Sequence, residues 1–119
     1  LSEVRELVGD DVAIGVSAHD VEEALDAERN GADYLGAGAV FSTSTKHDID
    51  LMPFDTLKAI CEAVSIPVVA IGGITRNNIM ELAGTGVDGV AVVSAILGAK
   101  DPGKATAELL KLSTKMVAK

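Results

Sequence analysis

The sequence predicts an α/β fold with a parallel sheet, which we expect to be half of a (β/α)8 TIM barrel. Along the 119 residues a first helical pattern is followed by four apolar runs that alternate with further helical patterns. Such alternation is typical of parallel strands joined by right-handed crossovers. Gly31-Ala32-Asp33 before the second run is echoed by Gly86-Val87-Asp88 before the fourth, which suggests the repeated modules of a barrel. Four strands are half of such a barrel, so residues 1–119 are expected to form one partial domain with open sheet edges.

The first elements follow from apolar spacing and capping residues. Apolar residues at positions 1, 4, 7 and 8 predict a helix. The apolar run at residues 12–16 predicts a strand that is covered on both faces. Asp20 is expected to cap the next helix, with Glu23 completing a capping-box pair, and Gly31 to end it. The chain opens within a predicted helix and without methionine, so we expect it to be a piece of a longer protein.

The remaining elements continue the alternation. Three further strands are expected at residues 33–39, 67–71 and 89–93. Pro53 is expected in the first turn of the helix after the second strand, and Thr75 to cap the helix after the third. Asp101 followed by Pro102 predicts the cap and first position of the last helix.

Composition excludes several classes of partner. The net charge of −8 disfavours nucleic acid and anionic membranes, since both would repel the chain at long range. No apolar run has the length of a membrane span, and no stretch resembles a signal peptide. The single cysteine, Cys61, excludes an internal disulfide, suits a reducing cytoplasm and is expected to fill core space. Any anionic ligand would therefore be held by local donors.

Polar residues follow the second predicted strand directly. The loop contains Thr43, Thr45 and Lys46, whose hydroxyls and ammonium group suit phosphate or pyrophosphate oxygens. A polar surface loop is the alternative interpretation. Asp48 and Asp50 in the same loop could approach a cation, but a solvated loop explains them equally well. No Cys or His cluster has metal-ligand spacing.

The other predicted strands also end in residues suited to ligand binding. Gly72-Gly73 allows a phosphate to approach the main chain, and Val93-Ser94 follows the next strand. Barrel enzymes commonly build a phosphate site from two such consecutive strand ends. Ser17 has no evident relay partner, so a hydrogen-bonding role suits it better than a nucleophilic one. His19 could serve as an acid or base, or as a capping or packing residue beside Asp20.

Five stretches together resemble the carboxyl-terminal half of the thiamine-phosphate synthase family, in register across nearly the whole chain. They are Ile14-Gly15-Val16-Ser17-Ala18-His19, Gly31-Ala32-Asp33-Tyr34, Phe41-Ser42-Thr43-Ser44-Thr45-Lys46, Ile66-Pro67-Val68-Val69-Ala70-Ile71-Gly72-Gly73-Ile74 and Gly86-Val87-Asp88-Gly89-Val90. The resemblance implies a (β/α)8 barrel of which this chain supplies the last four strands. It also implies that hydroxymethylpyrimidine pyrophosphate and hydroxyethylthiazole phosphate are joined into thiamine phosphate, with release of pyrophosphate and assistance by Mg²⁺.

The resemblance also implies roles for single residues. Thiazole-phosphate ligands are expected at Thr43 and Thr45 and at the backbone of Gly73, Val93 and Ser94. Lys46 and Ser17 are expected to contact the departing pyrophosphate, whose developing charge must be stabilised.

The chain departs from the family pattern in two ways. Ser42 stands where the family loop usually has proline, a position that shapes the loop more than it binds. The magnesium carboxylates and the remaining pyrimidine contacts of the family precede Leu1. The 119-residue piece is therefore expected to be inactive alone.

Three alternatives remain open. A thiazole tautomerase relative shares the barrel and the histidine matching His19 but typically lacks the loop residues found at 43–46. A half-barrel that pairs with itself through its open edges would be a non-catalytic assembly module. Another phosphate-binding barrel enzyme, such as a sugar-phosphate epimerase, is the broadest reading.

Overall fold

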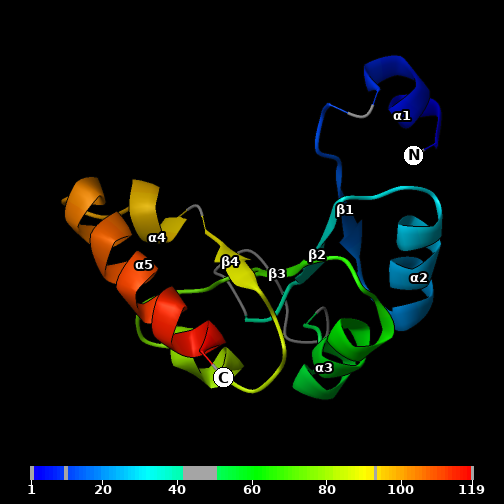
Figure 1. Ribbon diagram of the computed structural model, residues 1–119. Helices are drawn as coiled ribbons and strands as arrows, with labels where there is room; N and C mark the ends of the chain where they lie inside the picture. The colour runs from blue at the N-terminus through cyan, green and yellow to red at the C-terminus, as the bar shows by residue number, and fades with distance from the viewer. Residues whose placement is uncertain (1, 10, 42–50, 93, 119) are drawn as a thin grey trace.

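The centre of the molecule is a parallel four-stranded sheet. The computed structural model describes residues 2–9, 11–41, 51–92 and 94–118. Its strands are β1 (Gly15–Ala18), β2 (Tyr34–Gly38), β3 (Val68–Ile71) and β4 (Gly89–Ala91), which lie in the order β1-β2-β3-β4 (Figure 1). Each neighbouring pair is parallel, with Gly15 opposite Tyr34, Leu35 opposite Val68 and Val69 opposite Gly89. The predicted α/β class and parallel sheet are confirmed.

Helices alternate with the strands, and those that supply core side chains lie on one side of the sheet. They are α1 (Ser2–Val8), α2 (Val21–Arg29), α3 (Phe54–Ala63), the 3-10 helix η2 (Ile79–Leu82), α4 (Ser94–Leu97) and α5 (Pro102–Val117). In Figure 1, α2 and α3 lie beside β1 and β2, whereas η2 and α5 lie at the β4 end of the sheet. Across the described segments, no helix has both the length and the apolar character needed to cross a membrane.

The core lies between these helices and one face of the sheet. Leu35 and Ala37 on β2 and Val68 and Ala70 on β3 are almost completely buried. The helices bring further buried side chains, among them Ala24, Leu57, Ile60, Ile79, Leu82 and Leu109. Burying one such aliphatic side chain contributes roughly 1.5–3 kcal/mol to folding. The covered face is therefore the main source of stability.

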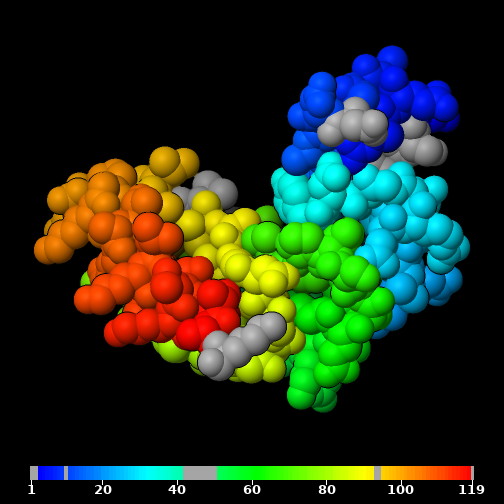
Figure 2. Space-filling view, viewed as in Figure 1, coloured from blue at the N-terminus to red at the C-terminus, as the bar shows by residue number. Residues whose placement is uncertain are grey.

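Within the described segments, no helix covers the opposite face of the sheet. Tyr34 is 41% exposed and Ile71 is 43% exposed, and Ser17 is exposed on the same face. The expectation of strands covered on both faces is therefore wrong for the described residues. Figure 2 shows the surface hollowed between the region of α4 and α5 and the region of α1 and β1. The apolar runs carry side chains for two faces, but the helices cover only one of them.

The repeated Gly-X-Asp segments perform the same structural task twice. Gly31 and Gly86 both have left-handed backbone, with φ of 99° and 96°. The Asp33 amide donates to the Ile14 carbonyl (2.8 Å), and the Ile14 amide donates to the Asp33 carboxylate (2.7 Å).

The second segment makes the same pair of bonds. The Asp88 amide donates to the Val68 carbonyl (2.8 Å), and the Val68 amide donates to the Asp88 carboxylate (2.9 Å). The sequence echo is thus a repeated clamp that sets the register of β1 with β2 and of β3 with β4.

One arginine ties α1 to the sheet. The Arg5 guanidinium donates to the carbonyls of Gly9 (3.0 Å), Val12 (2.8 Å) and Gly31 (2.7 Å) and to the Asp33 carboxylate (2.6 Å). The apolar side chains of α1 contribute little, because Leu7 is 85% exposed. The predicted first helix is confirmed, but polar contacts hold it in place.

The first strand starts later than expected. Residues 12–16 were expected to form it, whereas β1 runs from Gly15 to Ala18. Pairing with β2 begins where Ile14 meets Asp33, and the Val12 carbonyl bonds to Arg5 instead of to a strand. Val12 is accordingly 46% exposed. The apolar run located the strand approximately, while the clamp decides where it starts.

The helix expected after Thr75 is only a 3-10 turn. The Asn78 side chain accepts a hydrogen bond from the Thr75 amide (2.8 Å) and donates one to the Gly73 carbonyl (3.0 Å), so it ties the start of the turn to the loop after β3. The predicted cap at Thr75 is confirmed for the turn that leads into η2, because its hydroxyl accepts the Asn77 amide (3.2 Å) and its carbonyl accepts the Ile79 amide (3.0 Å). Asn78, directly before η2, makes no side-chain capping bond. Gly84, with φ of 87°, follows the turn and prevents its extension.

Candidate functional site

The carboxyl ends of β1, β2 and β3 meet around a small hollow. It has a volume of about 180 Å³ and is lined by Ser17, His19, Gly36, Gly38, Ala39, Ile71 and Gly72. Ser17 is thus a predicted site residue that borders the hollow, and Gly72 belongs to the predicted glycine pair. Ligand pockets usually have volumes of about 300–1,000 Å³. The smaller volume of this hollow is consistent with a site of which this chain supplies only one side.

Glycines create the floor of this hollow. A Cβ on Gly38 would lie 2.0 Å from the Ile71 carbonyl oxygen, and one on Gly72 would lie 2.6 Å from the Ala39 Cα. Gly72 also has left-handed backbone, with φ of 108°. The chain therefore requires glycine at both positions for the strand ends to approach one another.

The loop after β3 presents main-chain groups at the same end of the sheet. Gly73 has φ of 61°, and its carbonyl accepts the Asn78 side-chain amide (3.0 Å). The Asn78 side chain also accepts a hydrogen bond from the Thr75 amide, so this one side chain holds the loop at two points. The predicted phosphate-binding glycine thus lies on a braced loop.

The structure covers only part of the predicted site. Ser94 is the first residue of α4, as expected for a turn after the fourth strand. Thr43, Thr45, Lys46 and Val93 lie outside the described residues. The geometry therefore brings Ser17 and the Gly72-Gly73 loop to one end of the sheet, while the binding roles of all the predicted site residues stay predictions.

His19 has a specific partner that the sequence did not reveal. Its Nδ1 lies 3.0 Å from the Glu23 carboxylate, and its backbone amide donates to the same oxygen at 3.3 Å. Asp20 caps α2 as expected, accepting the Glu23 amide at 2.7 Å. Glu23 therefore reaches His19 instead of completing the capping box. The four-residue spacing of His19 and Glu23 was the signal available in the sequence.

Sequence reasoning also missed Gly36, Gly38, Ala39 and Ile71 as lining residues. The signal in the sequence was the spacing of Gly36 and Gly38. Residues two apart in a strand lie on the same face, so one face of β2 has no side chain at these two positions.

A larger hollow of about 470 Å³ lies elsewhere. Its lining comes from the turn after β3, the region of α4 and the start of α5: Thr75, Arg76, Asn77, Ala95, Ala99, Lys100, Ala105, Glu108 and Leu109. Arg76 and Glu108 form a loose ion pair there (3.6 Å). None of the predicted site residues within the described segments is among its lining residues, so size alone does not identify the site. The strand-end hollow is the one that the predicted site residue Ser17 borders.

Cys61 is unsuited to nucleophilic chemistry. Burial, with smaller contributions from the charges of Asp88 and Glu62, raises the pKa of its thiol to about 11. The half-buried side chain packs against the core from α3, as expected.

The Arg5 ion pair has the opposite effect on Asp33. The hydrogen bond from Arg5, followed by that from the Ile14 amide, holds the pKa of the Asp33 carboxyl below its usual value. Asp33 belongs to the clamp at the start of β2 and not to the strand-end hollow.

Comparison with known proteins finds a matching family model and similar proteins. The family model described as thiamine monophosphate synthase matches residues 1–96. Thiamine-phosphate synthase of Pyrococcus abyssi is 54% identical over 110 residues, which is 92% of this chain and 53% of that protein. The enzyme of Clostridium tetani is 53% identical over 106 residues, or 89% of this chain and 51% of that protein.

A solved structure shares both sequence and fold. Thiamine phosphate pyrophosphorylase from Pyrococcus furiosus superimposes with a TM-score of 0.86 at 47% identity, covering 99% of this chain and 56% of the other. The chain spans about half the length of the relatives that it matches. Both the sequence match and the shared fold extend over most of its residues, and the chain belongs to the thiamine monophosphate synthase family.

Proposed function

We propose that residues 1–119 are the carboxyl-terminal half of a (β/α)8 barrel that acts as a thiamine-phosphate synthase. The observation that carries this proposal is the 54% sequence identity to a thiamine-phosphate synthase over 92% of the chain. The parallel order of the strands supports a half-barrel, as does the sheet face that lacks helices. The active protein is a longer polypeptide that adds the preceding barrel half, and this piece alone is inactive.

The proposed reaction joins the two rings of thiamine phosphate. The bond between the pyrimidine methylene carbon and the pyrophosphate oxygen breaks, and its electron pair leaves with pyrophosphate. The lone pair of the thiazole nitrogen in hydroxyethylthiazole phosphate forms the new bond to that carbon. Capture by a neutral ring nitrogen needs no general base, so the catalyst acts by binding, positioning and stabilising the leaving group.

The residues divide between the two phosphate groups. We assign the thiazole phosphate to Thr43, Thr45 and the backbone of Gly73, Val93 and Ser94. The braced loop around Gly73 supports this assignment, because main-chain amides held in place bind phosphate without reorganising. Lys46 and Ser17 receive the departing pyrophosphate. Ser17 is exposed in the strand-end hollow, which supports its part in this role.

A metal site is not formed by the residues that the structure describes. Among them no group of three or more His, Cys, Asp or Glu side chains could hold a metal ion. We therefore assign no step of this chain to Mg²⁺, and its ligands are proposed to come from the preceding barrel half. A cytoplasmic location is likewise proposed from the single cysteine, Cys61.

Calorimetric titration with hydroxyethylthiazole phosphate tests the proposal. The 119-residue chain and the complete polypeptide are titrated, each with and without Thr45→Ala. We expect the complete polypeptide to bind, and Thr45→Ala to weaken binding about tenfold through loss of one hydrogen bond to a charged group. Binding by the chain alone would show that the thiazole-phosphate site is already formed in this half. No binding by the folded complete polypeptide would contradict the assignment.

A pair of variants separates the synthase from the tautomerase alternative. In a synthase, Lys46→Ala should lower thiamine phosphate formation at least about a hundredfold, because it removes charge stabilisation of the leaving group. In a tautomerase, His19→Ala should abolish activity while Lys46→Ala leaves it largely intact. The two variants are assayed side by side in the complete polypeptide, with each candidate reaction.

A further inference from the structure

His19 lies at the edge of the strand-end hollow, directly after β1 and two residues beyond Ser17. Its side chain is 69% exposed, so a solute in the hollow can reach the ring. Gly36, Gly38 and Gly72 line the same hollow and add no side chains that would screen the ring. The imidazole is therefore accessible from the side on which Ser17 is also exposed.

Glu23 determines which ring nitrogen faces a ligand. One carboxylate oxygen of Glu23 accepts both the His19 ring Nδ1 (3.0 Å) and the His19 backbone amide (3.3 Å). An ionised carboxylate only accepts hydrogen bonds, so Nδ1 must carry a proton. Nε2 is then the nitrogen left for the hollow: it is an acceptor in the neutral ring and a donor in the imidazolium form.

An anionic ligand in the hollow requires a hydrogen-bond donor at Nε2. Glu23 on α2 contacts the His19 ring. Asp20 is the next residue after His19, and its carboxylate accepts a hydrogen bond from the Glu23 amide. Among the described residues, those from β2, β3 and the positions just after them that line the hollow are glycine, alanine and isoleucine, which do not titrate. A neutral Nε2 would turn its lone pair toward an anionic ligand, whereas the protonated ring would donate a hydrogen bond to it.

We propose that His19 binds the departing pyrophosphate through a protonated Nε2, and that Glu23 is the positioning residue that holds the ring for this contact. The inference rests on the proposed synthase function, in which Ser17 contacts the same leaving group. When the carbon–oxygen bond breaks, the pyrophosphate oxygen gains the electron pair, and the Nε2–H hydrogen bond stabilises that charge. No proton transfer is needed. Binding of pyrophosphate is thereby linked to uptake of a proton by His19.

Calorimetry with inorganic pyrophosphate measures this proton directly. The complete polypeptide is titrated at about pH 7.5 in two buffers of different ionisation enthalpy, which gives the number of protons taken up. Pyrophosphate changes its own protonation on binding, so the wild type is compared with His19→Gln under identical conditions. We expect the wild type to take up more protons, by up to about one for each pyrophosphate, and to bind about tenfold more tightly.

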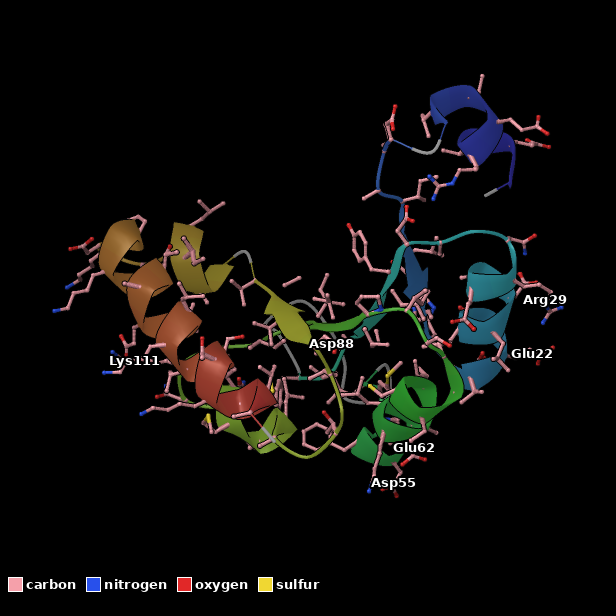
Figure 3. The ribbon with its side chains drawn as sticks, viewed as in Figure 1. Glu22, Arg29, Asp55, Glu62, Asp88 and Lys111 are labelled. Carbon is pink, nitrogen blue, oxygen red and sulfur yellow. The ribbon has the colours of Figure 1, made fainter. Side chains whose placement is uncertain are left out.

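Two glutamates on α2 provide a matched comparison. Glu23→Gln removes the charge that supports the imidazolium and should reduce proton uptake. Glu22→Gln removes the same charge one residue away, on an exposed side chain of α2 that does not line the strand-end hollow (Figure 3). It should leave proton uptake and affinity unchanged. His19 and Glu23 are both exposed, so we expect all three variants to fold.

The outcomes separate the inference from the function on which it rests. Equal proton uptake by the wild type and His19→Gln, in proteins that still form thiamine phosphate, would overturn the role of His19 and leave the synthase proposal standing. A wild type that neither binds pyrophosphate nor forms thiamine phosphate would overturn both. Greater proton uptake by the wild type, reduced by Glu23→Gln but not by Glu22→Gln, would support both.

Discussion

Asp33 shows how a single side chain can join three parts of the chain. Its carboxylate accepts the Ile14 amide before β1 and the Arg5 guanidinium from α1, while its own amide starts the pairing of β2. The side chain is 46% exposed, so solvent screens the ion pair and its direct contribution to stability is small. The geometric role is larger, because the same bonds decide the register of two strands.

Acid should expose the contribution of the Arg5–Asp33 pair. The pKa of Asp33 is lowered in the folded protein, so the pair stabilises the fold above the ordinary value of about 4. This contribution is lost as the pH falls through the lowered pKa. We expect the wild type to have a higher unfolding free energy than Asp33→Asn. This difference should be largest at neutral pH, for example at pH 7, and should decrease below about pH 4. Urea unfolding at several pH values measures it.

The Arg5→Gln background supplies the control for this prediction. Without the guanidinium, Asp33→Asn should have a weaker dependence on pH, because the largest cause of the lowered pKa is gone. An identical dependence in both backgrounds would show that Arg5 is not the cause.

Cys61 should react slowly in the folded protein. With a pKa of about 11, roughly one thiol in a thousand is ionised at pH 8, against about one in four for an ordinary cysteine. We therefore expect alkylation by iodoacetamide at pH 8 to be at least about a hundredfold slower in the folded protein than in urea. Equal rates, in a sample that circular dichroism shows to be folded, would contradict the raised pKa.

At the scale of elements, the sequence predicted those structures whose local signals agree with their packing. Asp101 caps α5 by accepting the Lys104 amide (3.1 Å), and Leu109 and Met116 on that helix are buried. Asp20 does the same for α2. Capping and apolar spacing depend on residues that are close together in the sequence, so they can be predicted from the sequence alone.

The errors occurred where a contact distant in sequence overrides the local pattern. β1 begins where Asp33 clamps Ile14, and no property of residues 12–16 contains that information. The short length of the helix after Thr75 has a local cause instead, because Gly84 with its left-handed backbone follows it closely. For the site, strand ends were predictable from topology, whereas the His19–Glu23 contact required the geometry of α2.

We expect alanine to be poorly tolerated at Gly72 in the loop after β3. The same substitution at Gly84 serves as the comparison that separates backbone strain from steric overlap. Both have left-handed backbone, with φ of 108° and 87°, so alanine costs at least about 1–2 kcal/mol at either position. An alanine Cβ at Gly84 meets no atom within 4 Å, whereas at Gly72 it lies 2.6 Å from the Ala39 Cα. We expect Gly72→Ala to destabilise the protein by about 1–3 kcal/mol more than Gly84→Ala, measured by chemical unfolding.

The same pair tests the link between this loop and the proposed site. Gly72→Ala pushes β2 and β3 apart at the hollow, so it should also weaken binding of hydroxyethylthiazole phosphate by the complete polypeptide. Gly84→Ala lies after η2 and should leave affinity unchanged. Equal losses of stability and unchanged affinity in both variants would show that the close approach to Ala39 is unimportant.

At the scale of the whole molecule, the described helices cover one face of the sheet and leave the other face uncovered. The covered face holds Leu35, Val68 and Ala70, while Tyr34 and Ile71 on the opposite face remain more than 40% exposed. In the described part of the chain, β1 and β4 are the outer strands and each has one unpaired edge. Unpaired edges and exposed apolar side chains both favour association with further strands.

We expect the 119-residue chain alone to associate instead of remaining a stable monomer. Sedimentation analysis should give a mass that rises with concentration, and addition of the preceding barrel half should replace this self-association by a one-to-one complex. Ile71→Lys, on the uncovered sheet face, should weaken self-association because it places a charge in the apolar contact. Met80→Lys is the matched control, since Met80 is equally exposed at 43% but lies on η2 among the covering helices. If both variants weaken association equally, the sheet face is not the contact surface; if the chain stays monomeric at all concentrations, the half-barrel needs no completion to be stable.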